Sequence, residues 1–388
     1  MKTKHLLKNI SITVVCFLLL STLLLSPKTN LDVNAHFETD VKHNSSVLIE
    51  YNTGKILYDN NSSEKLPIAS VTKLMTVLLT LEEIQSGNIA LTDKIVVSEN
   101  ASGMGGSQIF LDANNEYEIE ELLKSVIVAS ANDSSVALAE HIAGSEQNFV
   151  KLMNQKASSL GLKNTNYSNC TGLPSNDGYS SAYDQAIILK QVLSHDLYHT
   201  YSSIWMEDFV HPSGRITQMT NTNKLSRFYQ GCIGGKTGST NQAKYCLAVG
   251  AERNNNKYIA VVLGADNSKD RFKLASDLLN YGFSNFESKT LFGNKDLENK
   301  TISIKNNKHQ VKLKAEREFS VVVNKNEEIN FSLNYHLPTQ LKSVSENQIV
   351  GTVEILVDSV VVDTINILSC DNFKEPTIWE NFKEIINT

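Results

Sequence analysis

The 388-residue chain has few arginines and no cluster of basic residues. Its net charge is −6, and no stretch is rich in Lys and Arg. A deficit of positive charge argues against nucleic acid as the main partner. The sequence also lacks Gly-x-Ser-x-Gly, the signature of α/β-hydrolases, and has no glycine-rich loop for phosphate. These absences leave other kinds of hydrolytic and binding chemistry open.

Metal-binding patterns are also missing. The cysteines beyond the N-terminal region form no Cys-x-x-Cys pair and have no zinc spacing. We interpret them as mostly free, buried thiols, although an exported chain could pair them. His195 and His199 lie one helical turn apart around Asp196, but no third ligand accompanies them. We therefore expect no metal and no cofactor. The cysteines concerned are Cys170, Cys232, Cys246 and Cys370.

The N-terminus has the pattern of a secretory signal. Lys2, Lys4 and Lys8 precede an apolar run at 10–25, and Val33-Asn34-Ala35 follows. A positive start, a short apolar core and a small-residue site predict a signal peptide, residues 1–35, cut after Ala35. The alternative is an uncleaved anchor. In both cases the body of the protein works outside the cytoplasmic membrane, at the cell surface or cell wall.

The stretch 67–76 carries the first chemical motif. Ser70 and Lys73 stand three residues apart at the start of an apolar run that predicts a buried helix. This spacing puts both side chains on one face. A lysine can act as base for a serine if burial or a neighbouring cation lowers its pKa from about 10.4. Ser62 and Lys65 repeat the spacing in a polar loop, where no helix would align them.

Two further motifs complete a candidate site. Ser130 and Asn132 fall in a break between two predicted helices, where a hydroxyl can pass a proton and an amide can hold a carbonyl. Lys236, Thr237 and Gly238 lie on a predicted strand. Lys236 offers a positive charge that could bind a carboxylate and could also lower the pKa of Lys73. Thr237 offers a hydroxyl. The glycine would let a substrate backbone lie along the strand. Each motif alone is weak evidence, since 345–347 repeats Ser-x-Asn.

Hydrophobic periodicity predicts an α+β fold for residues 36–286. Two strands at the start and three at the end would form a five-stranded antiparallel sheet flanked by helices, with a helical lobe inserted. We expect Asp133 to cap one helix and Gly282 to end another. The expected strands are 46–51, 55–58, 233–240, 245–252 and 258–264; the expected helices are 70–87, 119–128, 134–143, 149–160, 181–194 and 271–281.

The composition changes after residue 286. Short alternating segments predict a small all-β, sandwich-like domain at 287–375. A short amphipathic tail, residues 376–388, follows, with Trp379 and Phe382 on its apolar face. Such a tail could lie on a membrane or pack on its own domain.

The order Ser-x-x-Lys, Ser-x-Asn, Lys-Thr-Gly matches the signature of penicillin-recognising serine enzymes. The chain resembles the low-molecular-mass penicillin-binding proteins, the serine-type D-Ala-D-Ala carboxypeptidases, which implies a β-lactamase/transpeptidase-like domain. The resemblance implies that Ser70 is the acyl-ester nucleophile and Lys73 its base. It implies a proton relay through Ser130 and substrate positioning by Asn132. Lys236 and Thr237 would hold the terminal carboxylate.

The same resemblance extends to the rim of the site. The backbone N–H groups of Ser70 and Ser239 would form the oxyanion hole, beside Gly238. Arg271 corresponds to an arginine near the carboxylate site, with a structural salt bridge as the alternative. Some relatives carry His where this chain has Ser239.

The implied function is removal of the terminal D-Ala from peptidoglycan stem peptides through an acyl-enzyme, with penicillins acylating Ser70. A class A-like β-lactamase is one alternative, but the loop at 164–178 contains no glutamate to activate water. A non-catalytic wall-binding protein is another. We expect a monomer whose partners are stem peptides and β-lactams, with peripheral membrane contact through the tail and no nucleic acid.

Overall fold

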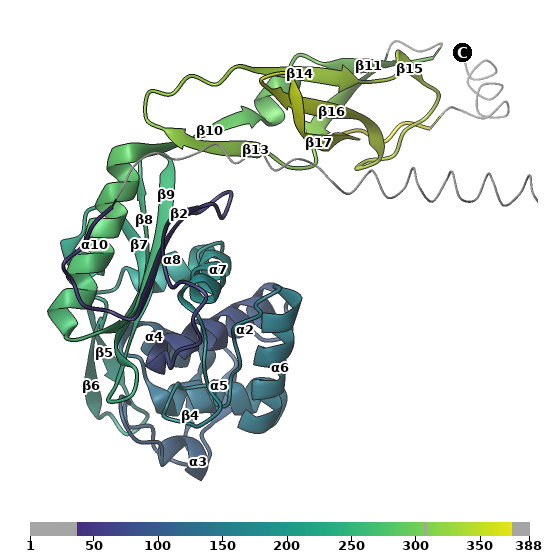
Figure 1. The fold of residues 1–388 in the computed structure, drawn as a ribbon. Helices are drawn as coiled ribbons and strands as arrows, with labels where there is room; N and C mark the ends of the chain where they lie inside the picture. The colour runs from purple at the N-terminus through teal and green to yellow at the C-terminus, as the bar shows by residue number, and fades with distance from the viewer. Residues whose placement is uncertain (1–36, 306–308, 375–388) are drawn as a thin grey trace, which may run out of the picture. The chain divides into compact units, whose positions relative to one another are not determined.

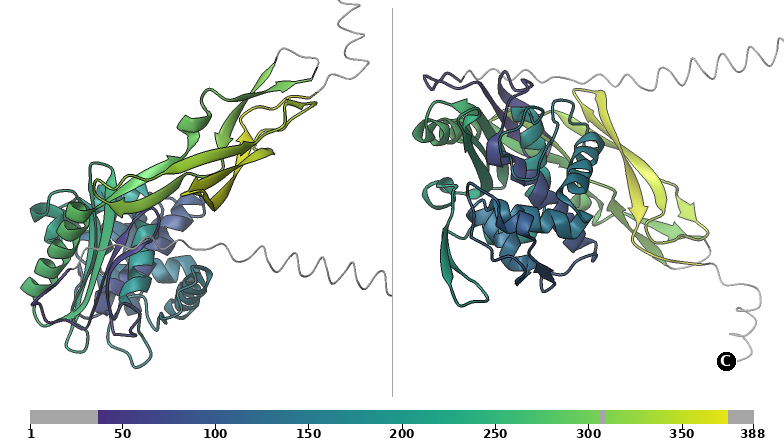
Figure 2. Two further views of the ribbon diagram at one scale, coloured as in Figure 1. Left: turned by 45° about the horizontal axis from the view of Figure 1, so that its top comes forward. Right: turned by 90° about the horizontal axis from the view of Figure 1, so that it is seen from below.

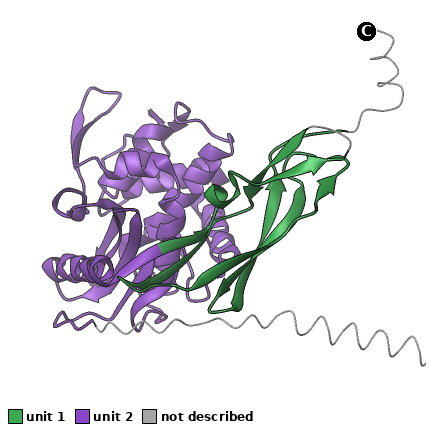
Figure 3. Ribbon diagram, turned by 90° about the horizontal axis from the view of Figure 1, so that it is seen from above, with its two compact units in different colours: residues 1–33, 289–388 green, residues 34–288 purple. Residues whose placement is uncertain are grey.

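The computed structural model describes residues 37–305 and 309–374. The predicted signal peptide and tail lie outside the described residues. The chain forms two compact units: the first along the chain ends at Ser288 and is purple in Figure 3, and the second begins at Lys289 and is green there. Each unit is described by itself.

A five-stranded sheet forms the centre of the first unit. Its order is β2-β1-β9-β8-β7, and every neighbouring pair is antiparallel. The predicted α+β class is confirmed. The strands are β1 (Ser45–Glu50), β2 (Ile56–Asn60), β7 (Cys232–Thr240), β8 (Lys244–Arg253) and β9 (Asn256–Ala265).

Helices cover both faces of this sheet. α10 (Ser268–Asn285) packs on one face, and α7 (Ala182–Val192) and α8 (Asp196–Ser202) pack on the other (Figures 1 and 2). Two of the three inner strands, β8 and β9, are buried along most of their length. Their nearly continuous apolar sequences are typical of strands covered on both sides.

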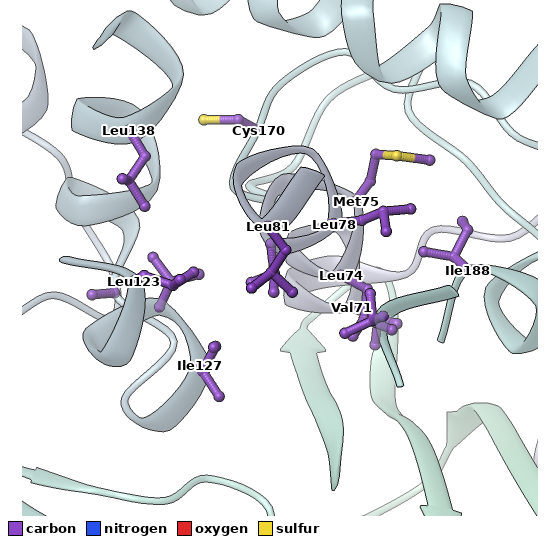
Figure 4. Packing of buried hydrophobic residues seen from close by; sticks show 14 of the residues in the cluster. Val71, Leu74, Met75, Leu78, Leu81, Leu123, Ile127, Leu138, Cys170 and Ile188 are labelled. Atoms are coloured by element: carbon purple, nitrogen blue, oxygen red, sulfur yellow. The ribbon is translucent and has the colours of Figure 1, made fainter. Parts of the chain in front are cut away.

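The predicted central helix is confirmed as α2 (Lys73–Gln85), which follows the 3₁₀ turn η2 (Ala69–Thr72). Leu74, Leu78 and Leu81 are buried and pack in one cluster with residues of α4 and α5 (Figure 4). The surrounding elements are α3 (Glu99–Ser102), α4 (Ile119–Val128), α5 (Asn132–Ala143), α6 (Glu146–Ser159) and the strand pair β3 (Lys94–Val96) and β4 (Glu116–Glu118).

Two predicted helix ends are wrong. Asp133 lies inside the first turn of α5, whose N-cap is Ala131. Gly282 lies inside α10, which runs on to Asn285. A β-carbon at position 282 would lie 3.1 Å from the ring of Tyr258 and 3.2 Å from Leu48. This glycine therefore permits close packing on the sheet and does not end the helix.

One hairpin was not predicted. β5 (Met206–Val210) and β6 (Ile216–Thr220) pair around a tight connection that contains Pro212 and Gly214. The Pro-Ser-Gly turn is the signal that could have identified it, because the apolar residues of the two strands do not alternate.

In the described residues 289–305 and 309–374, the second unit is all-β apart from the turn η3 (Asn294–Leu297), as predicted. Six strands form a sheet in the order β14-β16-β17-β12-β11-β15, and β10 pairs with β13. No helix in the described part of the chain is long and apolar enough to cross a membrane. The strands are β10 (Phe286–Phe292), β11 (Thr301–Ile304), β12 (Gln310–Ala315), β13 (Phe319–Asn324), β14 (Phe331–His336), β15 (Gln340–Leu341), β16 (Ile349–Val357) and β17 (Val360–Ser369).

Candidate active site

Ser70 lies in the turn η2, directly before α2. The preceding residue, Ala69, has φ +48°, a left-handed conformation that is costly for a residue with a β-carbon. A β-carbon on Gly172 would collide with the carbonyl of Ala69, so the loop at 164–178 packs directly against this turn. Ser70 itself remains partly exposed. The turn is therefore held by the loop while its serine stays accessible.

Lys73 is fully buried beside Ser70. Its Nζ donates to Ser70 Oγ at 3.0 Å, to Asn132 Oδ1 at 2.6 Å and to the Thr171 carbonyl at 2.6 Å. Burial lowers the pKa of Lys73 to about 7. A neutral amine keeps two N–H donors and gains a lone pair. Because Asn132 Oδ1 and Thr171 O can only accept, that lone pair would face the one partner with a proton, Ser70 Oγ.

Asn132 is fixed at both ends of its amide. Its Oδ1 accepts from Lys73, and its Nδ2 donates to the Gly105 carbonyl at 2.6 Å. The segment that supplies this carbonyl is held in turn by Asp133, whose buried carboxylate accepts from the N–H groups of Ile109 and Leu111. This network orients the amide oxygen toward Lys73.

Ser130 and Lys236 form a second serine–lysine pair. Lys236 Nζ donates to Ser130 Oγ at 2.7 Å and to the Thr237 carbonyl at 3.0 Å. Ser130 has φ +63° in the short break between α4 and α5. Burial is the main cause that lowers the pKa of Lys236, followed by the positive charges of Lys73 and Arg271. For Lys73 too, burial is the largest cause of the lowered pKa. Repulsion between two ammonium groups is mutual, so a contribution of Lys236 to the neutrality of Lys73 stays a prediction.

The strand β7 forms the edge of the sheet beside η2. Thr237 Oγ1 donates to Thr222 Oγ1 at 2.9 Å, and Ser239 is exposed. A β-carbon on Gly238 would lie 2.5 Å from the Ile68 carbonyl and 3.1 Å from the Ser70 nitrogen. Gly238 therefore lets the strand approach the turn that carries Ser70. The predicted reason for a glycine here was different, namely room for a substrate backbone.

Arg271 reaches β7 from α10 and is 8% exposed. Its Nη1 donates to the carbonyls of Gly238 at 3.0 Å and Cys246 at 3.3 Å, and its Nη2 to Ser268 Oγ at 3.3 Å. No ion pair joins Arg271 to another described residue, so the salt-bridge alternative is wrong.

The second Ser-x-x-Lys motif does not form a serine–lysine hydrogen bond. Ser62 Oγ donates to Asp59, and the Lys65 ammonium lies over the Tyr179 ring.

The Thr171 carbonyl, which accepts from Lys73, was not predicted from the sequence. A backbone acceptor leaves no signal in the residue type. A pocket adjoins η2, and its lining includes Pro67, Ala69, Leu173, Pro174 and Thr240.

The site contains a partly exposed serine that is hydrogen-bonded to a buried lysine, a second serine–lysine pair and a strand edge. This combination defines a serine acyl-transfer enzyme of the Ser-x-x-Lys class. Residues 32–267 match the D-alanyl-D-alanine carboxypeptidase family, peptidase S11. Residues 286–375 match the C-terminal domain of penicillin-binding protein 5. The chain belongs to the D-alanyl-D-alanine carboxypeptidase family.

Individual relatives agree with this assignment. The D-alanyl-D-alanine carboxypeptidase DacF of Bacillus subtilis is 42% identical over 286 residues, 74% of each chain. Penicillin-binding protein 5 of Haemophilus influenzae has 31% identity and a TM-score of 0.71, and the match covers 88% of this chain and 100% of that one. A mutant of the Streptomyces K15 DD-transpeptidase has 26% identity and a TM-score of 0.60, over 63% of this chain and 99% of that chain.

Proposed function

We propose that Ser70 is the nucleophile with which this serine-type D-alanyl-D-alanine carboxypeptidase removes the terminal D-Ala from peptidoglycan stem peptides. The observation that carries the proposal is the hydrogen bond between Ser70 and Lys73, whose other two contacts are pure acceptors. This arrangement gives a neutral lysine no better proton source than the serine hydroxyl.

The acylation step follows from these positions. Neutral Lys73 takes the proton of Ser70 Oγ as the oxygen attacks the penultimate D-Ala carbonyl. The tetrahedral oxyanion would be stabilised by the N–H groups of Ser70 and Ser239, at about 3–4 kcal/mol for each donor in other serine enzymes. The C–N bond then breaks, and Ser130 passes the proton from Lys73 to the leaving amine. Water hydrolyses the acyl-enzyme and regenerates Ser70.

Substrate recognition involves the second half of the site. Lys236 and Thr237 would bind the terminal carboxylate, and the Asn132 amide would bind a substrate carbonyl. A carboxylate next to Lys236 would offset the burial that lowers the pKa of this lysine. β-Lactams, which combine an amide-like carbonyl with a carboxylate, would use the same groups and acylate Ser70.

Mass spectrometry after brief exposure to penicillin tests the nucleophile. We expect one adduct on the wild type and none on Ser70→Ala. Ser62→Ala is the matched control, because Ser62 belongs to the same sequence pattern but not to the site, and it should be labelled like the wild type. An adduct on Ser70→Ala would refute the assignment.

The lifetime of the adduct and the release of D-Ala separate the alternatives. A carboxypeptidase should hold the penicilloyl group for long times and release D-Ala from a D-Ala-D-Ala peptide. Rapid turnover of penicillin would indicate a β-lactamase. A failure to release D-Ala would indicate a non-catalytic homologue.

The location of the protein completes the proposal. Peptidoglycan lies outside the cytoplasm, so the N-terminal residues 1–35 would serve as a signal peptide, with the catalytic domain at 36–286 and the β domain at 287–375. The protein would act as a monomer, and the tail at 376–388 would contact the membrane surface. Fractionation of cells that express the chain with and without residues 376–388 tests the membrane contact.

A further inference from the structure

The guanidinium of Arg271 is a buried cation without an anionic partner among the described residues. It is 8% exposed, and its three hydrogen bonds go to two backbone carbonyls and one hydroxyl. Its Nε has no hydrogen-bond partner. A buried, unpaired charge is costly to keep in a fold. The side chain therefore needs an explanation beyond packing.

The Gly238 carbonyl that Arg271 contacts belongs to the peptide that links Gly238 to Ser239. The Gly238 carbonyl and the Ser239 N–H are the two ends of one planar amide, and in a trans peptide they point in opposite directions. The N–H of Ser239 therefore points away from Arg271. The Cα of Gly238 lies beside the turn of the nucleophile, since a β-carbon there would be 3.1 Å from the Ser70 nitrogen.

We propose that Arg271 is a positioning residue of the oxyanion hole, acting through the Gly238–Ser239 peptide. This inference rests on the proposed function. The cationic hydrogen bond fixes the plane of that amide and draws electron density toward the carbonyl oxygen, which makes the Ser239 N–H a stronger donor. Arg271 then stabilises the oxyanion without touching the substrate.

The surroundings of the guanidinium favour this role over direct recognition of the substrate carboxylate. Nη1 is committed to Gly238 and Cys246, and Nη2 to Ser268. The guanidinium carbon also lies 5.5 Å from the ring centre of Tyr245 and 4.8 Å from that of Phe272. A carboxylate would have to displace these contacts, whereas Lys236 and Thr237 already provide a cation and a hydroxyl.

A pair of ligands separates the two roles. One is a D-Ala-D-Ala peptide, which has both a reacting carbonyl and a carboxylate. The other is an N-acyl boronic acid in which boron replaces the carboxyl carbon of the penultimate D-Ala. Ser70 Oγ adds to boron as Lys73 takes its proton, and the tetrahedral adduct places a boronate oxygen in the oxyanion hole. This ligand has no carboxylate.

For Arg271→Gln we expect both ligands to be affected. The peptide kcat/KM should fall, and the boronic acid Ki should rise, by about ten- to a hundredfold, less than the 10²–10³-fold cost of removing a donor outright. Arg271→Lys, which keeps one cationic donor, should recover part of both losses. Lys273→Gln, an exposed residue of α10 outside the site, is the control and should match the wild type.

Other outcomes contradict the inference in distinct ways. A peptide loss with an unchanged boronic acid Ki would assign Arg271 to the carboxylate. Unchanged values for both ligands would leave Arg271 with packing alone. If Arg271→Gln fails to fold, Arg271→Lys is measured in its place, and parallel losses are still required. A wild type that releases no D-Ala would instead overturn the proposed function itself.

Discussion

At the scale of residues, the site contains two lysines that are buried in the protein interior, where lysine is rarely found. Lys73 and Lys236 are at most 1% exposed and rank among the largest fully buried side chains of the described chain. Burial disfavours the ammonium form, so each residue would be more stable in the fold as a neutral amine. In the proposed reaction Lys73 as base and Lys236 as carboxylate-binding group would need opposite protonation states in closely similar surroundings. A bound substrate carboxylate would favour the charged form of Lys236.

The pKa of Lys73 predicts the pH dependence of acylation. Below about 7 the lysine is protonated and cannot accept the serine proton, so the rate should fall about tenfold per pH unit. Above about 7 the neutral form dominates and the rate should level off. The second-order rate of penicillin acylation between pH 5.5 and 9.5 measures this limb, and thermal unfolding over the same range controls for loss of fold. A rate that still rises steeply above pH 9 would contradict the prediction.

At the scale of elements, glycines decide how closely the parts of the site approach. Gly238 brings β7 against η2, and Gly172 brings the loop at 164–178 against the same turn. Both contacts join backbone to backbone, so no flexible side chain can move aside. Gly282 has the same role between α10 and the sheet, where it faces Tyr258 and Leu48.

Gly282→Ala tests this packing. Alanine favours a helix by about 1 kcal/mol over glycine, but overpacking costs about 1–3 kcal/mol. Since the sheet side chains lie at 3.1–3.2 Å from the added carbon, we expect net destabilisation in urea unfolding. Ser276→Ala, in the same helix and only partly buried, is the control and should be neutral or slightly stabilising. A gain in stability for Gly282→Ala would show that the sheet relaxes at no cost.

At the scale of the whole molecule, the predicted site residues all lie in the first compact unit. The unit ends at Ser288, and Arg271 is the last of the site residues. The K15 DD-transpeptidase structure matches along 99% of its own length but only 63% of this chain. A relative therefore exists at about the length of the first unit.

We predict that residues 36–288, produced alone, are acylated by penicillin at a rate within about threefold of the full chain. Ser70, Lys73 and Lys236 have their hydrogen-bond partners within this unit, which is the reason for the expectation. Labelling kinetics of the fragment and the full chain give the comparison. A folded fragment that is not acylated would assign the second unit a part in the reaction.

The sequence by itself determined the residue types of the site and the periods of most elements. The helix Ile119–Val128 and the edge strand with Lys236 follow from local patterns that are independent of the rest of the chain. Three motifs in a fixed order identified the chemistry because serine, lysine and asparagine leave a signal in the residue type itself.

Only the tertiary structure decided what each group faces. The acceptor role of the Thr171 carbonyl and the direction of Arg271 toward Gly238 depend on residues 98 and 33 positions away, respectively. The pKa of Lys73 is set by burial, which requires the whole core to assemble around it. Long-range packing leaves no local pattern, and it is this packing that separates the assembled Ser70–Lys73 pair from the unassembled Ser62–Lys65 pair.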